Sequence, residues 1–186
     1  MFKWFVHKMI IELTSETSSQ TIEIGRQLGQ LLLKQLQQSA FADDGAFVIA
    51  LSGELGAGKT TLTQGIAAGM GVQGPVTSPT FTLVNEYPLA QGVLIHMDSY
   101  RLGESNDGAA LEAAAFGIDE LLDTDHAVLI IEWAERLRDL LPVDTLLITL
   151  CYAAADAAGR TLHLQADGPY SQQLLRWLDT QPGQTP

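Results

Sequence analysis

Cysteine is almost absent from this chain of 186 residues, which contains only Cys151. A single cysteine cannot form a disulfide within the chain, and no cluster of cysteine and histidine indicates a structural zinc site. Cys151 lies in an apolar run over residues 146–152, so we expect it to fill a small space in the core. The fold is therefore expected to depend on the packing of apolar residues, which make up 46% of the sequence.

Positive charge is also scarce, because 10 Lys and Arg residues stand against 22 Asp and Glu residues and leave a net charge of −12. A protein that binds nucleic acid by itself usually presents a basic face. We therefore expect no autonomous binding to RNA or DNA, and any role with tRNA to be indirect. An acidic surface suits a basic patch on a partner protein.

Long apolar runs are missing: none reaches the roughly 18 residues that cross a bilayer. The N-terminus lacks both the uninterrupted apolar stretch and the cleavage site of a signal peptide. We therefore expect no membrane association and a cytoplasmic location. The length favours one domain over 9–180, with an N-terminal extension at 1–8 and a flexible tail at 181–186.

Alternating strand and helix patterns indicate the α/β class. We predict a three-layer P-loop NTPase fold whose central sheet is mostly parallel, with an antiparallel hairpin near the C-terminus. Continuous apolar runs at 46–51 and 127–133 fit strands that are buried on both faces. Further strands are predicted at 9–13, 81–87, 93–98, 144–152 and 160–166, and helices at 20–38, 60–70, 106–122 with a break at Gly117, 134–140 and 170–179.

Residues 53–60 match the phosphate-binding pattern G-x-x-x-x-G-K-[ST] at every fixed position. Glycines allow the backbone amides of such a loop to face phosphate oxygens, and the N-terminus of the next helix attracts negative charge. Lys59 is predicted to reach the β- and γ-phosphates of ATP, and the Thr60 hydroxyl to ligate Mg²⁺. The predicted nucleotide-binding residues of this loop are Gly53, Glu54, Leu55, Gly56, Ala57, Gly58, Lys59, Thr60 and Thr61.

Two acidic residues end apolar strands beyond the loop: Asp98 follows Met97, and Glu132 follows Ile131. Ligands collect at the carboxyl ends of strands in α/β sheets, and a P-loop needs a second carboxylate for Mg²⁺ or for the attacking water. Both acids are therefore candidates. The alternatives are a turn acid at Asp98 and an acid in the first turn of a helix at Glu132.

Two further side chains are candidates for contact with the nucleotide. Thr80 lies about twenty residues beyond the loop, where many P-loop proteins carry a hydroxyl that senses the γ-phosphate. Its alternative is a plain turn before a strand. Trp133 is either a core residue or a lid on the nucleotide site. His96 is interpreted as a packed or strand-end histidine on the strand face opposite Met97.

Several motifs follow one another along residues 21–142: Thr21-Ile22-Glu23-Ile24-Gly25, the loop at 53–61, Ser78-Pro79-Thr80-Phe81 with the strand to Asn85-Glu86-Tyr87, His96-Met97-Asp98-Ser99-Tyr100-Arg101-Leu102, Gly117-Ile118-Asp119-Glu120 and Ile131-Glu132-Trp133-Ala134-Glu135-Arg136-Leu137. Taken together, they resemble the TsaE (YjeE-type) ATPase family, the bacterial tRNA threonylcarbamoyladenosine biosynthesis proteins. Residues 54, 97 and 99 depart mildly from the family pattern, which commonly has Asp, Phe and Leu there, and no group needed for chemistry is lost.

The resemblance implies an ATPase that works with the TsaD–TsaB complex, which modifies adenosine 37 of tRNAs reading codons that begin with A. In this ATPase we expect Lys59 to bind phosphate and to be exposed while the loop is empty. We expect Thr60 and Glu132 to hold Mg²⁺. Asp98 positions the attacking water or a metal-bound water, and Thr80 reports the γ-phosphate. The candidate arginine for charge stabilisation is Arg101, unless a partner completes the site, in which case the isolated protein is a slow ATPase.

Three other classes of P-loop protein fit this sequence less well. A small-molecule P-loop kinase usually brings an arginine-bearing lid, and residues 104–125 contain neither arginine nor lysine. A GTPase needs Asn-Lys-x-Asp downstream of the loop, where this chain has no lysine. A binding module without useful turnover is disfavoured because Thr60, Asp98 and Glu132 are all intact.

Overall fold

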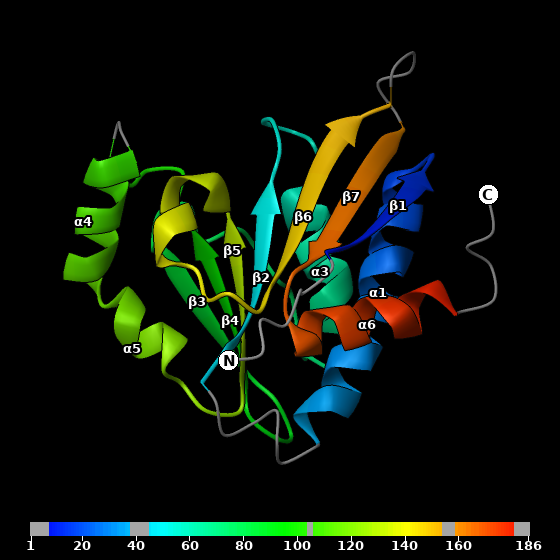
Figure 1. Ribbon diagram of the computed structural model, residues 1–186, viewed down its shortest axis with the longest axis horizontal. Coiled ribbons are helices and arrows are strands. Elements are labelled where there is room, and N and C mark those ends of the chain that lie inside the picture. The colour runs from blue at the N-terminus through cyan, green and yellow to red at the C-terminus, as the bar shows by residue number, and fades with distance from the viewer. Residues whose placement is uncertain (1–7, 38–44, 104–105, 154–158, 181–186) are drawn as a thin grey trace, which may run out of the picture.

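Figure 1 presents a computed structural model of the chain, which describes residues 8–37, 45–103, 106–153 and 159–180. The predicted tail at 181–186 and all but Lys8 of the predicted extension lie outside the described residues. Among the described helices, none is both long enough and apolar enough to cross a membrane.

The seven strands form one mixed sheet in the order β1-β7-β6-β2-β5-β4-β3. Its centre is parallel, because β2 pairs with β5 and β6, and β4 pairs with β5, in the parallel sense. The strands are β1 (Met9–Ser15), β2 (Phe47–Ser52), β3 (Val84–Pro88), β4 (Val93–Asp98), β5 (Ala127–Glu132), β6 (Thr145–Tyr152) and β7 (Arg160–Ala166).

The prediction of a mostly parallel sheet is wrong at the edges, although the C-terminal hairpin of β6 and β7 is confirmed. The edge strand β3 runs antiparallel to β4, and the opposite edge strand β1 runs antiparallel to β7. Residues 89–92 between β3 and β4 are too few for a parallel crossover, which needs a dozen residues or more, so an antiparallel pair is the only short solution.

Helices cover both faces of the sheet, as the three-layer prediction required (Figure 1). Side chains of β2 alternate between two cores: Ile49 and Leu51 pack with α1, α3 and α6, whereas Val48 and Ala50 pack with α4, α5 and η1. The helical elements are α1 (Ser18–Leu36), α3 (Lys59–Gly69), α4 (Asn106–Phe116), α5 (Ile118–Leu122), the 3₁₀ helix η1 (Ala134–Leu140) and α6 (Pro169–Asp179).

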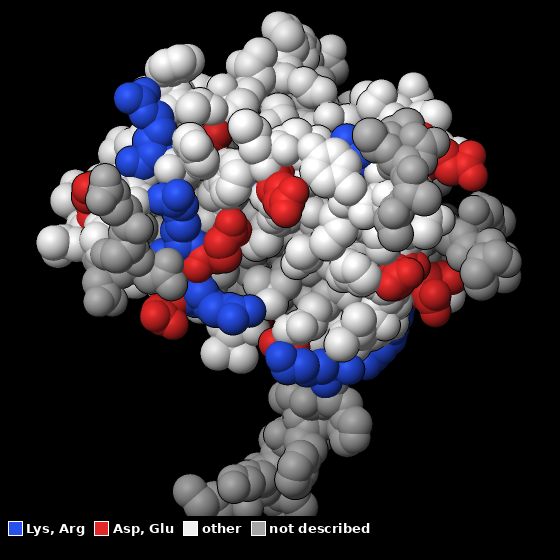
Figure 2. All heavy atoms as spheres, turned by 90° about the horizontal axis from the view of Figure 1, so that it is seen from above, with Lys and Arg blue, Asp and Glu red and all other residues white. Residues whose placement is uncertain are grey.

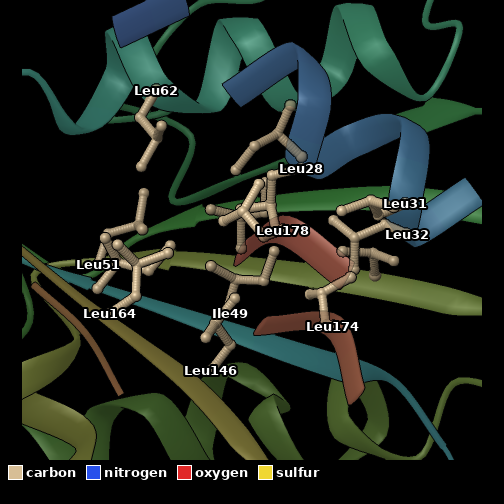
Figure 3. Packing of buried hydrophobic residues seen from close by; sticks show 14 of the residues in the cluster. Leu28, Leu31, Leu32, Ile49, Leu51, Leu62, Leu146, Leu164, Leu174 and Leu178 are labelled. Atoms are coloured by element: carbon tan, nitrogen blue, oxygen red, sulfur yellow. The ribbon is translucent and has the colours of Figure 1, made fainter. Parts of the chain in front are cut away.

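The first of these cores is rich in leucine (Figure 3). Leu28 and Leu32 of α1 and Leu174 and Leu178 of α6 face the sheet, where Ile49 is fully buried. Burying a leucine or isoleucine side chain stabilises a fold by about 1.5–3 kcal/mol relative to leaving it exposed. The periodic apolar residues that predicted these helices are therefore the ones that hold them on the sheet.

One predicted strand begins late: β3 starts at Val84 and not at residue 81. Leu83 adopts φ 65°, and its amide donates to the carbonyl of Pro79 over 2.7 Å, so a turn occupies the start of the predicted strand. The turn keeps Thr80 at the sheet edge beside Asp98, where it matters for the site described below.

Cys151 is exposed, so its prediction as a core residue is wrong. In the second half of β6 the buried residues are Ile148 and Leu150, which belong to the core formed with α1 and α6, and strand alternation places Cys151 on the other face beside exposed Thr149. The apolar run is continuous in sequence, but only one face of this strand is covered at that point.

Helices α1 and α3 approach each other closely through glycine. A Cβ at Gly65 would lie 2.2 Å from the carbonyl oxygen of Ile22 and 3.0 Å from the Cα of Gly25. One turn further, a Cβ at Gly29 would lie 2.1 Å from the carbonyl oxygen of Ile66. The two helix backbones can touch only because these positions carry no side chain, and α3 is the helix that follows the phosphate-binding loop.

We expect Gly65→Ala to lower the free energy of unfolding by about 1–2 kcal/mol, because the added methyl group overpacks the contact between α1 and α3. Urea unfolding followed by circular dichroism measures this change. Ala68→Leu on the exposed face of α3 is the control and should change stability by less than about 0.5 kcal/mol. A rise in stability, as helix propensity alone predicts for alanine, would contradict the close-packing account.

Candidate active site

The parallel register places the carboxyl ends of three central strands, β2, β5 and β4, side by side. Leu51 of β2 lies opposite Glu132 of β5, and Glu132 lies opposite Asp98 of β4. The predicted phosphate-binding loop leaves β2 at this end, so both candidate carboxylates come beside it, as the sequence predicted.

Glycine gives the loop its path. Gly53 has φ 137°, and a Cβ there would lie 2.3 Å from the carbonyl oxygen of Leu150. Gly58 has φ 105° and caps α3, whose first residue is Lys59. A side chain is strained in this left-handed backbone region, which explains why glycine stands at both positions.

A cleft of about 310 Å³ opens between the loop and the ends of β4 and β5. Gly53, Glu54 and Ala57 of the predicted loop residues do not line it, although they belong to the same turn. The residues that line the cleft are Leu55, Gly56, Gly58, Lys59, Thr60, Thr61, Ser78, Thr80, Asp98, Tyr100, Glu132 and Trp133.

The carboxylate of Glu132 is buried, with 3% of the residue exposed. The Thr60 hydroxyl lies 2.9 Å from Oε1 and 3.0 Å from Oε2 of Glu132, and donates a hydrogen bond to this carboxylate. The predicted Mg²⁺ ligands on α3 and β5 are therefore in direct contact.

His96 is packed, as the sequence predicted, but it also contacts the candidate site, which the sequence did not indicate. It lies on the strand face opposite Met97, as predicted, but its Nε2 lies 2.8 Å from Oε1 of Glu132. The side chain is fully buried, and its Nδ1 has no hydrogen-bond partner among the described residues. Since an ionised carboxylate can only accept, the contact places a proton on Nε2. His96 thus fixes the orientation of Glu132.

Lys59 is buried, with 5% of the residue exposed, so its predicted exposure is wrong. Its Nζ donates to the carbonyl oxygens of Gly53 at 2.6 Å and Glu54 at 3.0 Å. Trp133 covers it, since Nζ lies 3.6 Å from the centre of the indole ring. Burial lowers the pKa of Lys59, while nearby negative charges, Glu132 foremost, act in the opposite direction.

Trp133 is a cover over the cleft and not a core residue, because it is half-buried and lines the cleft. It adopts φ 62°, an unusual conformation for a bulky residue, which turns the chain into η1. The Ser99 hydroxyl lies 2.9 Å from the carbonyl oxygens of Glu132 and Trp133, and the Tyr100 ring centre lies 4.9 Å from that of Trp133.

Asp98 is also buried, and it is linked to Thr80. Oδ2 of Asp98 accepts hydrogen bonds from Ser78 at 2.8 Å and from Thr80 at 2.7 Å, while Oδ1 accepts from the Tyr100 amide at 2.9 Å. The two candidates therefore form one unit that holds residues 78–80 against the end of β4. Ser78, which sequence reasoning did not single out as a site residue, belongs to this unit.

Arg101 does not line the cleft. Its guanidinium carbon lies 5.5 Å from the ring centre of Phe81, which is 88% exposed. The candidate arginine thus flanks the turn at residues 78–81 and lies outside the lining of the cleft.

The donor set fits Mg²⁺, a cation that is usually bound by one or two protein carboxylates together with phosphate and water. Thr60 and Glu132 supply adjacent oxygen atoms in the cleft. Within the described ranges, no group of three or more His, Cys, Asp or Glu side chains could hold a metal ion.

Comparison with known proteins shows the family of this chain. The family model for "Threonylcarbamoyl adenosine biosynthesis protein TsaE" matches residues 15–162. The chain belongs to the TsaE family. All the residues that line the cleft fall within the matched range, and the resemblance drawn from the sequence motifs is confirmed.

Relatives named as tRNA threonylcarbamoyladenosine biosynthesis protein TsaE occur in Haemophilus influenzae and Streptomyces coelicolor. The former is 37% identical over 131 residues, covering 70% of this chain and 75% of the relative. The latter is 38% identical over 151 residues, covering 77% and 89%. The crystal structure of Bacillus subtilis YdiB matches with a TM-score of 0.68 at 28% identity, covering 93% of this chain and 96% of that one.

We expect His96→Ala to lower the free energy of unfolding by roughly 2–4 kcal/mol, because it leaves a cavity and removes one of the hydrogen bonds to the buried Glu132. Urea unfolding measures the loss. His163→Ala is the control, because the His163–Glu12 pair is exposed and is worth less than about 1 kcal/mol. Equal losses for the two variants would show that the contact between His96 and Glu132 does not stabilise the fold.

Proposed function

We propose that this chain is a Mg²⁺-dependent ATPase that acts in the biosynthesis of threonylcarbamoyladenosine in tRNA. The name of its family supports the process. One observation carries the activity: the phosphate-binding loop at residues 53–60 opens into the same cleft as the contact between Thr60 and Glu132. This combination offers phosphate donors and metal ligands side by side, as ATP with Mg²⁺ requires.

In this proposal, the backbone amides of residues 54–60 and the Lys59 amine bind the phosphates. Thr60 and Glu132 would hold Mg²⁺, which would supply positive charge to offset the negative charge that develops on the phosphate oxygens. Asp98 would position the attacking water beside the γ-phosphate, and Thr80, which donates to Asp98, would report the presence of that phosphate. Water then bonds to the γ-phosphorus as the bond to the β–γ bridging oxygen breaks, which yields ADP and phosphate.

The contacts of the Lys59 amine imply that it must change hydrogen-bond partners when phosphate binds. The Lys59 amine donates to carbonyl oxygens of its own loop and lies under the Trp133 ring. To bind phosphate, the amine must exchange these carbonyl acceptors for phosphate oxygens. Phosphate then supplies the negative charge that favours the protonated amine, which burial disfavours.

The partner in this proposal is the TsaD–TsaB complex, which modifies adenosine 37 of tRNAs reading codons that begin with A. This chain would contact tRNA only indirectly. Its net charge of −12 supports an indirect contact with tRNA. The face in Figure 2 carries both acidic and basic side chains. Because Arg101 lies outside the cleft, charge stabilisation by a partner is the simpler arrangement, and hydrolysis by the isolated chain is expected to be slow.

The decisive experiment measures phosphate release from ATP by the purified chain, with and without TsaD–TsaB and with and without Mg²⁺. We expect slow, Mg²⁺-dependent hydrolysis that rises at least tenfold when the complex is added. Full-speed hydrolysis that ignores TsaD–TsaB would overturn the accessory role. Binding of ATP without hydrolysis even in the presence of the complex would favour a nucleotide-dependent binding module, and a phosphorylated metabolite would favour a small-molecule kinase.

We expect Lys59→Ala to reduce ATP hydrolysis by at least about 100-fold, because the charge that contacts the β- and γ-phosphates is lost. The measurement is phosphate release at saturating TsaD–TsaB. Lys34→Ala, which removes another lysine from the exposed end of α1, should leave the rate unchanged. Circular dichroism must show that both variants are folded. Retention of the full rate by Lys59→Ala would refute the assignment of Lys59.

Glu132→Gln separates metal binding from folding, because the amide oxygen can still accept a hydrogen bond from Thr60 or His96 while the negative charge is gone. We expect Mg²⁺ to tighten ATP binding to the wild type but to have at least about fivefold less effect on this variant. Calorimetric titration with and without Mg²⁺ measures the difference. Glu135→Gln, which removes an exposed charge nearby, is the matched control; if it behaves like Glu132→Gln, Glu132 is not the metal ligand.

A further inference from the structure

The phosphate-binding loop has a second side that its sequence motif does not describe. If backbone amides face the phosphates, the carbonyl oxygens of the same peptides must face elsewhere and need donors of their own. The carbonyl oxygens of three consecutive residues, at positions 55, 56 and 57, accept hydrogen bonds from side chains on the hairpin of β6 and β7.

Tyr152, the last residue of β6, and Arg160, the first residue of β7, supply these donors. The Tyr152 hydroxyl donates to the carbonyl oxygen of Leu55 over 2.9 Å. Arg160 spans two peptides, since Nη2 donates to Gly56 over 3.1 Å and Nε donates to Ala57 over 2.9 Å. The planar guanidinium suits two neighbouring acceptors, which a lysine could not contact in the same way.

The two side chains also support each other. Tyr152 and Arg160 are paired across the hairpin, and the guanidinium carbon of Arg160 lies 4.3 Å from the centre of the Tyr152 ring. They therefore act as one unit, which is anchored on the antiparallel pair of β6 and β7 and not on the loop. We call Tyr152 and Arg160 the hairpin clamp.

The clamp accounts for glycine at position 56, which is a variable position of the phosphate-binding pattern. A Cβ on Gly56 would lie 2.8 Å from the Tyr152 hydroxyl oxygen, in addition to the strain of φ 78°. The loop and the hairpin thus fit each other closely on the side away from the cleft.

We propose that Tyr152 and Arg160 are positioning residues that preorganise the phosphate-binding loop for a nucleoside triphosphate. By holding the carbonyl oxygens of residues 55–57, the clamp fixes three peptide planes of the loop. The planes held at Leu55 and Ala57 carry the amides of Gly56 and Gly58, which can face the phosphates, whereas the Ala57 amide donates to the carbonyl oxygen of Glu54 over 3.1 Å. The positive charge of Arg160 at the carbonyl end of these peptides also complements their dipoles, so that their amide ends attract anions more strongly. This inference rests on the proposed function, because it takes a nucleotide to be the ligand of the cleft.

The test compares Tyr152→Phe and Arg160→Lys with the wild type. Tyr152→Phe removes only the hydroxyl donor, and Arg160→Lys keeps the charge but cannot contact both carbonyl oxygens. Arg176→Lys on the exposed face of α6 and Cys151→Ser beside Tyr152 are the matched controls. Each protein is titrated with Mg²⁺ and a non-hydrolysable ATP analogue, and amide hydrogen exchange over residues 53–60 is measured without nucleotide.

We expect the dissociation constant of the analogue to rise roughly 3- to 10-fold for Tyr152→Phe and at least about 10-fold for Arg160→Lys. Exchange of the loop amides should accelerate in both variants, whereas exchange in the core strands should not change. In ATP hydrolysis with TsaD–TsaB, KM should rise while kcat stays within about twofold, because the clamp acts through the loop and touches no reacting atom. The controls should match the wild type in every measurement.

The outcomes separate this inference from the proposed function. If the wild type binds the analogue and both clamp variants bind it equally well, the clamp does not position the loop, while the ATPase proposal stands. If the variants lose core-strand protection or global stability along with affinity, the two residues serve the fold and the inference is overturned. If the wild type binds no ATP analogue at all, the proposed function fails first, and the nucleotide role of the clamp fails with it.

Discussion

The buried carboxylate of Glu132 is the interaction on which the rest of the site depends. A carboxylate that is 3% exposed needs hydrogen-bond partners, and its partners come from two other elements: Thr60 from α3 and His96 from β4. These contacts tie the strand end, the helix that follows the loop and the neighbouring strand to one another. Thr60 and Glu132, the proposed metal ligands, are therefore held in contact by the requirement to satisfy one buried carboxylate.

The same loop is held from its other sides by contacts that have no chemical role of their own. The glycines of α1 and α3, including Gly25 and Gly65, allow the helix after the loop to lie against α1 with its backbone in contact. On the side away from the cleft, Tyr152 and Arg160 bind the loop carbonyls. The loop thus lies between a close helix pair and a hairpin, and both contact its backbone or the helix that follows it.

The arrangement fits an accessory ATPase in tRNA modification. The candidate site residues lie at the start of α3 and at the ends of β4 and β5, whereas Leu55 and Phe81, which expose apolar surface beside them, lie in loops. Asp98 links the turn at Ser78 and Thr80 to the end of β4.

Local patterns in the sequence determined a large part of this protein. The phosphate-binding loop, the strands that end in Asp98 and Glu132, and the break between α4 and α5 at Gly117 all follow from short-range spacing and residue chemistry. The family also follows from them, because its motifs are contiguous in the chain. Where only adjacent residues matter, the sequence is sufficient.

Only the tertiary structure decided the rest, and the reason is sequence separation. His96 is 36 residues from Glu132, and Arg160 is 103 residues from Ala57, so no local pattern links either pair. The exposure of Cys151 and the burial of Lys59 depend on what lies opposite each residue, a matter of strand register and of how the chain turns at Trp133. The sequence thus predicted which groups lie together at the cleft, and packing decided which groups hold them in place.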